Sequence, residues 1–179
     1  MTINDNDIIK TLNASRETGI RMLLSKYQEP LYWHIRRLVV SHDDAQDATQ
    51  ETFVRMFLSL EQFRGDSSLR TWLYRIATNE ALRLIGKRRQ ETISLDSVTT
   101  GVDIIASDNY VDYADKLAVK LQKAILTLPP KQQLAFNLRY YDELDFDEIA
   151  KIADSTATSI KASYHIAKDK IIKYMNSND

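Results

Sequence analysis

Few residues in this chain can break a helix, and this scarcity constrains the fold more than any other feature. Only four glycines and three prolines occur in 179 residues, whereas average usage would give roughly 20. Tight turns between strands depend on these two residue types, so the chain has little material for β-hairpins. At 44%, the apolar fraction is still high enough for a packed core. We therefore expect an all-α fold.

Apolar residues recur at helical spacing through most of the sequence, with one long interruption. They predict helices over about 20–38, 42–60 and 69–86, and again over about 111–128, 131–141, 146–153 and 157–175. Pro30 should kink the first helix or mark a boundary just before it. Residues 90–110 lose the period and are rich in Ser, Thr and Asp, which predicts a flexible acidic linker. The predicted architecture is two helical domains, 1–90 and 113–179, joined by a linker over 91–112.

Positive charge is concentrated in one predicted helix, although the net charge of the chain is −1. Residues 69–90 contain six basic side chains against one acidic one, Glu80. Trp72, Tyr74 and Asn79 are interleaved with them. Cations neutralise phosphates and exposed aromatic rings stack on unpaired bases, so this helix is a candidate nucleic-acid surface. A solvated charged face with Trp72 in the core is an equally good interpretation of the pattern alone.

The C-terminal part has the pattern of a helix-turn-helix. A short apolar-striped segment over 146–153 is followed by Asp154, Ser155 and Thr156, and then by a longer helix from about Ala157. In a helix-turn-helix the second helix lies in the major groove of DNA. Either Thr156 or Thr158 is a candidate N-cap for that helix. The alternative is an ordinary helical hairpin.

Evidence for catalysis or metal binding is weak. The absence of cysteine excludes disulfides, thiolate catalysis and Cys-ligated zinc. His42 precedes Asp43, but no second His stands at ligand spacing, and acidic residues are common at the start of a helix. We therefore expect no enzyme, cofactor, metal or small-molecule substrate. The chain also shows no signal-peptide pattern and no apolar run of membrane-spanning length, which favours a cytoplasmic protein.

Two N-terminal segments carry specific motifs. Residues 44–53, DAQDATQETF, contain the pattern D-A-x-D-x-x-Q-E-x-F, and residues 63–79, FRGDSSLRTWLYRIATN, end in the pattern T-W-L-x-R-I-A-x-N. Both resemble the corresponding segments of bacterial sigma factors of the extracytoplasmic-function (ECF) group in the sigma-70 family. Leu128-Pro129 and Glu148-Ile149-Ala150 match its C-terminal domain less specifically. The resemblance covers about 10–175 and implies an alternative sigma factor that binds RNA polymerase core, directs it to specific promoters and assists DNA melting.

The resemblance also implies three binding surfaces. The clamp surface would bind the clamp helices of the polymerase β′ subunit and comprises Asp44, Asp47, Gln50, Glu51 and Phe53. The minus-ten surface would bind the minus-ten promoter element and comprises Arg64, Ser67, Ser68, Arg75, Asn79, Arg83, Lys87 and Arg88. The minus-thirty-five surface would bind the upstream element and comprises Thr156, Thr158, Ser159, Lys161, Ala162 and His165. The polymerase β subunit and an anti-sigma factor, often membrane-bound, are further partners that the family implies.

The predicted recognition helix departs from the family pattern. Ser163 and Ile166 stand where the family commonly has arginine, and Lys168 replaces a third. Asp154 stands at the usual turn glycine. Fewer cations should weaken phosphate binding and flatten its dependence on salt. Two other interpretations remain open at this point: a dimeric helix-turn-helix repressor that binds a palindrome without polymerase, and an enzyme that uses His42 with Asp43 or Asp47.

Overall fold

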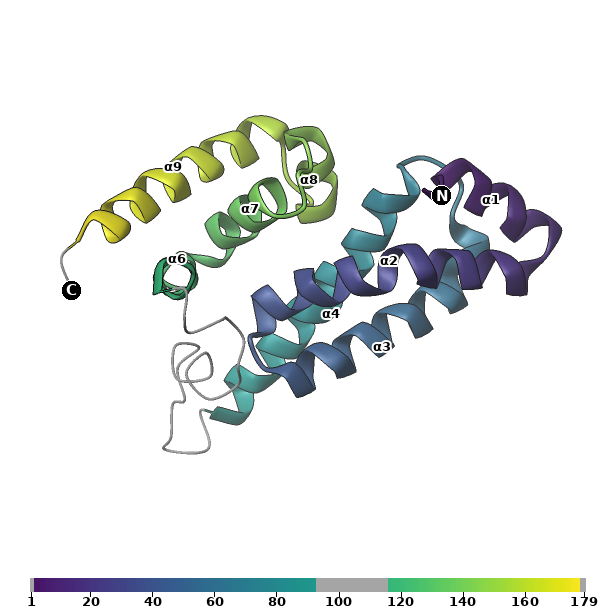
Figure 1. Cartoon of the computed structure of the whole chain (residues 1–179), viewed down its shortest axis with the longest axis horizontal. Helices are drawn as coiled ribbons and strands as arrows, with labels where there is room; N and C mark the ends of the chain where they lie inside the picture. The colour runs from purple at the N-terminus through teal and green to yellow at the C-terminus, as the bar shows by residue number, and fades with distance from the viewer. Residues whose placement is uncertain (1, 93–115, 178–179) are drawn as a thin grey trace.

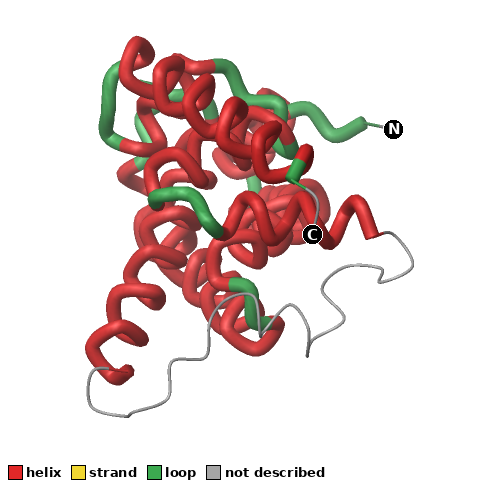
Figure 2. Tube along the Cα trace, turned by 90° about the vertical axis from the view of Figure 1, so that its left-hand side faces the viewer, coloured by secondary structure: helices red, strands yellow, loops and turns green. Residues whose placement is uncertain are grey.

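All regular elements in the described residues, 2–92 and 116–177, are helices in the computed structural model (Figure 1). The N-terminal domain contains α1 (Asp5–Ala14), α2 (Arg16–Val39), α3 (His42–Ser59), the short 3-10 helix η1 (Leu60–Gln62) and α4 (Leu69–Thr92). The C-terminal domain contains α6 (Lys116–Leu126), α7 (Pro130–Tyr140), α8 (Phe146–Ala153) and α9 (Ala157–Asn176). Figure 2 shows that mostly short loops join them. The predicted all-α fold with two helical domains is confirmed.

Helices α2, α3 and α4 pack against one another, and α1 folds back along the start of α2. The return is tight at Gly19, where an added Cβ would lie 2.6 Å from the Cα of Leu12. Only glycine permits such an approach between two backbones. The sequence analysis did not predict α1, although Asn4 caps it by accepting a hydrogen bond from the Asn6 N–H (2.9 Å).

Of the two outcomes expected at Pro30, a helix boundary does not occur, and the predicted end of α4 was wrong. Helix α2 runs continuously through Pro30, so no helix ends at the residue before it. Helix α4 continues to Thr92, past the predicted end near Gly86, and its last two residues fall in the segment predicted as linker. Residues 93–112 of that segment lie outside the described residues.

The loop over 63–68 sets where α4 begins. Gly65 has a φ of +78°, a left-handed conformation that favours glycine. The Ser68 Oγ accepts a hydrogen bond from the Thr71 N–H (3.0 Å), which is the geometry of a helix N-cap. The predicted loop and helix start are therefore confirmed.

The C-terminal domain contains the predicted helix-turn-helix, formed by α8 and α9. A capping box starts α8: Asp145 Oδ1 accepts from the Glu148 N–H (2.8 Å), and Glu148 Oε2 accepts from the Asp145 N–H (3.0 Å). Asp154 ends α8 in the left-handed conformation (φ 52°, ψ 53°). Of the two candidate caps for α9, Thr156 is the one used, since its Oγ1 accepts from the Ser159 N–H (3.2 Å).

The two domains pack against each other through apolar side chains. Helix α4 contacts α8, and α2 contacts α7, as Figure 1 shows. Leu138, Leu144 and Ile149 of the C-terminal domain are completely buried and belong to the same apolar cluster as Leu31 and Leu73 of the N-terminal domain. A smaller cluster holds α6, α7 and α9 together and comprises Ala124, Ile125, Leu128, Phe136, Ala167 and Ile171.

His34 is a completely buried polar residue on α2. Its Nε2 and the Thr78 Oγ1 of α4 lie 2.8 Å apart and share a hydrogen bond. Burial, with a smaller contribution from the charge of Arg37, lowers the pKa of His34 to about 3. His34 is therefore neutral in the folded protein at neutral pH.

His34 should make the protein less stable as the pH falls. Because its pKa is lowered to about 3 in the folded state but is about 6.5 when unfolded, only the unfolded chain binds this proton between those values. The free energy of unfolding should therefore fall by about 1 kcal/mol per pH unit below pH 6.5 through this group. Urea unfolding at pH 7.5 and 5.5 measures the change. His34→Gln should abolish this part of the slope and the exposed His165→Gln should keep it; equal slopes for both variants would contradict the assignment.

Candidate polymerase and DNA interfaces

The clamp surface lies on the side of α3 that faces away from the core. Ala45, Ala48 and Thr52 on α3 are buried against the other helices. Asp47 and Gln50 are exposed, and Glu51 and Phe53 are half-buried. Helix α3 therefore presents a polar face whose apolar neighbours anchor it to the domain.

Asp44 is less accessible than the other acidic residues of the clamp surface. Only 17% of its side chain is exposed, and it forms an ion pair with Arg88 of α4. Arg88 belongs to the predicted minus-ten surface. The pair therefore joins the two predicted surfaces instead of leaving both residues open to partners.

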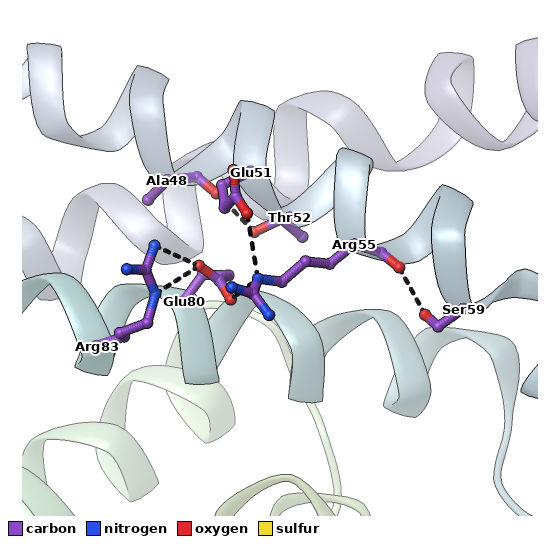
Figure 3. Close-up of polar contacts among 7 residues, drawn as sticks. All are labelled: Ala48, Glu51, Thr52, Arg55, Ser59, Glu80 and Arg83. Carbon is purple, nitrogen blue, oxygen red and sulfur yellow. Dashed lines mark hydrogen bonds and ion pairs between the residues drawn. The ribbon is translucent and has the colours of Figure 1, made fainter.

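A buried carboxylate makes a second connection between α3 and α4 (Figure 3). Glu80 on α4 is 5% exposed and is ion-paired with Arg55 of α3 and with Arg83 of α4. Arg55 also pairs with Glu51, at 3.3 Å from Nε to Oε1. Figure 3 shows these four side chains gathered between the two helices. Their chain of ion pairs connects the clamp surface, at Glu51, with the minus-ten surface, at Arg83.

The contact with Glu80 restricts what Arg83 can bind. The Nε and Nη2 of Arg83 donate to Glu80 Oε2 at 3.1 and 3.0 Å. About half of the side chain, 55%, remains exposed. Arg83 can therefore reach a phosphate or base through its remaining nitrogen, Nη1, while Glu80 fixes the orientation of its guanidinium.

The rest of the minus-ten surface is mostly open to solvent. Arg64, Arg75, Asn79 and Lys87 are exposed, and Ser67 is half-buried. The hydroxyl of Ser68, in contrast, is engaged in capping α4.

Trp72 lies partly beneath this surface. It is half-buried against the core, and its ring centroid is 5.1 Å from that of Phe63. Trp72 therefore packs partly into the core, as one of the two interpretations of the pattern had it.

The minus-thirty-five surface occupies the first half of α9. Thr158, Lys161, Ala162 and His165 are exposed there. Thr156 caps the helix, and the Ser159 Oγ lies 2.6 Å from the Lys131 Nζ, which donates to it. Five of the six predicted residues, Thr156 included, are therefore exposed, and Ser159 is half-buried.

The domain interface contains a polar cluster that the sequence analysis missed. Asp142, in the turn between α7 and α8, has a side chain only 8% exposed. The Tyr74 hydroxyl donates to its Oδ1 (2.7 Å), and Arg70 donates to its main-chain carbonyl. Arg37 Nη1 and His34 Nδ1 lie 3.6 and 3.9 Å from its Oδ2. No periodicity or motif marks these positions, because the cluster forms only where the two domains meet.

Burial controls the titration of this cluster. It raises the pKa of Asp142, although the Tyr74 hydrogen bond and the charges of Arg37 and Arg70 act in the opposite direction. Burial, the charge of Asp142 and its hydrogen bond raise the pKa of Tyr74 well above its usual value. Tyr74 therefore keeps its proton and acts as a donor.

The residues considered for catalysis do not form a catalytic arrangement. His42 Nδ1 lies 2.6 Å from the Tyr32 hydroxyl, a local hydrogen bond at the start of α3. Within residues 2–92 and 116–177, no three His, Asp or Glu side chains gather as a metal site would require. The helices described in those ranges also include none long and apolar enough to cross a membrane.

Comparison with known protein families decides between the remaining interpretations. Residues 23–91 match the family model for sigma-70 region 2, and residues 118–171 match that for sigma-70 region 4. These are 69 and 54 residues, or 123 of the 179 in all. The chain belongs to the sigma-70 family, in its ECF group. It is an alternative sigma factor that directs RNA polymerase to promoters, and it is not an enzyme.

Relatives match over nearly their whole length. The chain is 25% identical to the RNA polymerase sigma-H factor of Pseudomonas aeruginosa, over 94% of this chain and 92% of that protein. It is 27% identical to the ECF RNA polymerase sigma-E factor of Escherichia coli, over 94% and 93%.

Solved structures share the fold. The sigma factor RpoE in complex with the anti-sigma factor NepR from Bartonella quintana has a TM-score of 0.72 at 20% identity, over 89% of this chain and 98% of that one. CnrH in complex with the cytosolic domain of CnrY has a TM-score of 0.72 at 15% identity, over 98% and 99%.

Removing the buried charge at Glu80 should loosen the crossing of α3 and α4. We expect Glu80→Gln to lower the free energy of unfolding by about 1–2 kcal/mol, because two charged hydrogen-bonded partners lose their carboxylate but are half-exposed and regain water. Urea unfolding measures the loss. The matched control is the exposed Glu29→Gln, which should stay within about 0.5 kcal/mol of wild type. Equal stability of the two variants would show that Glu80 does not hold the helices together.

Proposed function

We propose that this sigma factor binds the β′ clamp helices of RNA polymerase through α3 and the minus-ten element through the 63–68 loop and α4. The main support is that a polar face and a cationic face lie on two helices joined by buried ion pairs. Asp47 and Gln50 are exposed on α3, and Arg75 and Asn79 are exposed on α4. Polymerase and the opened strand would then be held by one packed unit.

We assign the minus-thirty-five element to the helix-turn-helix of α8 and α9. The exposed Thr158, Lys161 and Ala162 lie in the first turns of α9, the part of a recognition helix that contacts base edges. Lys161 is the single cation among the predicted contacts. The upstream contact should therefore depend weakly on salt. The N-terminal domain, over 1–90, would provide the polymerase and minus-ten contacts, and the domain over 113–179 the upstream contact.

The proposal also covers regulation and location. One similar solved structure contains a sigma factor bound to an anti-sigma factor, and another contains CnrH bound to the cytosolic domain of CnrY. We propose that an anti-sigma factor anchored in a membrane also binds this chain. The β subunit of polymerase is a further proposed partner. Since the proposed partners are RNA polymerase and promoter DNA, we place the protein in the cytoplasm.

Charge reversal on the clamp surface tests polymerase binding. Asp47→Lys or Glu51→Lys should lower the affinity for core polymerase at least tenfold. A partner surface that complements an acidic-polar face is basic, and it would be repelled by the introduced lysine. Co-elution of the purified variants with core enzyme on a sizing column measures the effect, and circular dichroism checks that they fold. Asp169→Lys on the exposed side of α9 is the control. Wild-type co-elution of both α3 variants would show that the clamp surface is misplaced.

Substitution on the minus-ten surface tests DNA opening separately. Arg75→Ala and Asn79→Ala should leave core binding unchanged but reduce promoter opening several-fold, since each removes an exposed donor for phosphate or an unpaired base. Permanganate footprinting of unpaired thymines on a cognate promoter measures opening. Asn13→Ala on α1 serves as the control. If both variants give the wild-type footprint, the DNA surface lies elsewhere.

A further inference from the structure

We propose that the N-terminal domain carries a carboxylate-binding site whose occupant is Asp142 of the same chain, and that this contact keeps the sigma factor closed until it meets polymerase and promoter. The proposal rests on the function proposed above. The site is formed by His34 and Arg37 of α2 and by Arg70 and Tyr74 of α4. It binds the turn between α7 and α8.

The site has the chemistry of a carboxylate receptor. The Tyr74 hydroxyl donates to Asp142 Oδ1 at 2.7 Å, and Arg37 Nη1 approaches Oδ2 at 3.6 Å. Arg70 binds the main-chain carbonyl of the same residue. The guanidinium of Arg37 also lies over the ring of Tyr141, 4.1 Å from its centroid. This contact holds in place the residue that precedes Asp142. The side chains that form the site all belong to the N-terminal domain, and the residues that they contact, Tyr141 and Asp142, are neighbours in the C-terminal domain.

The polar fit is incomplete, which makes the contact releasable. Asp142 Oδ2, Arg37 Nη1 and His34 Nδ1 are all buried, and none of them has a hydrogen-bond partner among the described residues. Buried polar atoms without partners favour states in which water reaches them. Opening the interface would hydrate all three atoms at once.

Apolar burial favours the closed arrangement in the free chain. Leu144, two residues after Asp142, is completely buried, as are Leu138 before the turn and Ile149 after it. Separating the domains would expose apolar surface at this turn. The closed state is therefore stable without a partner, although the missing hydrogen bonds of Asp142, Arg37 and His34 disfavour it.

A closed chain is too short to contact both promoter elements. The minus-ten and minus-thirty-five elements lie about 25 base pairs apart, or roughly 85 Å of B-form DNA at 3.4 Å per base pair. A compact chain of this length is only about 40 Å across, from a radius of gyration near 16 Å. The 23 residues between α4 and α6 can extend to at most about 80 Å. Release of Asp142 would therefore let the domains separate far enough to contact both elements.

A distance measurement on the purified full chain tests the closed state. The chain contains no cysteine, so Lys10→Cys on α1 and Lys168→Cys on α9, both exposed in wild type, accept spin labels without background. Electron–electron resonance should give one narrow distance for this labelled chain. Asp142→Asn should move most of the population to longer distances, because its amide donors would then face Arg37 and His34. Glu143→Gln, which neutralises the exposed neighbouring acid, should leave the narrow distance unchanged.

A second variant protects the test against local misfolding. Tyr74→Phe removes only the hydroxyl that binds Asp142, and it should also lengthen the distance while the circular dichroism spectrum stays helical. A narrow, wild-type distance in both Asp142→Asn and Tyr74→Phe would overturn the proposal. A broad distribution in the labelled parent chain would also overturn it.

Promoter assays separate this proposal from the proposed function. With core polymerase and limiting sigma factor, Asp142→Asn should form open complexes several-fold faster than wild type or Glu143→Gln, because opening of the chain no longer precedes binding. An unchanged or slower rate would overturn the regulatory role of the contact. If no form of the chain binds core polymerase, the function proposed above fails, whereas the distance measurement still decides whether Asp142 closes the chain.

Discussion

Helix α4 packs against three other helices, α2, α3 and α8, and still keeps one face exposed. The rest of the structure depends on this constraint. One part of its surface is buried against α2 and α3, another contacts α8, and a third remains exposed with Arg75 and Asn79. A helix with apolar residues on so much of its surface is stable only when partner helices cover it. The packing that forms the N-terminal core therefore also fixes the direction of the cationic face.

Ionic contacts fix the orientation of α3 relative to α4. Glu80 is buried between Arg55 and Arg83, and Asp44 pairs with Arg88. Exposed ion pairs contribute little to stability, but buried ones specify how two elements are oriented when their geometry is satisfied. In the function proposed above, this orientation relates the proposed polymerase-binding face to the proposed DNA-binding face, so that docking on polymerase would also place the minus-ten contacts.

Local sequence signals predicted most of the fold, and long-range contacts account for what they missed. The bounds of α8 and α9 followed from apolar period and capping residues, and the family follows from two motifs within residues 44–79. Helix α1 was missed because a short helix carries little periodic signal, and of the two outcomes expected at Pro30 a helix boundary does not occur, since α2 continues through it. The partners of Asp142 and Glu80 could not be predicted, since each pairing joins residues on different helices. For the same reason, sequence placed Asp44 and Arg88 on separate surfaces, whereas the structure pairs them.

Run-off transcription with purified core polymerase and a library of genomic promoter fragments tests the central claim most directly. The account predicts transcripts that require both the chain and core enzyme, from fragments that share an upstream and a downstream element. It also predicts that the chain alone binds the same duplex fragments weakly. Tight binding to a palindrome by the chain alone, unaffected by core polymerase and without transcripts, would contradict the account.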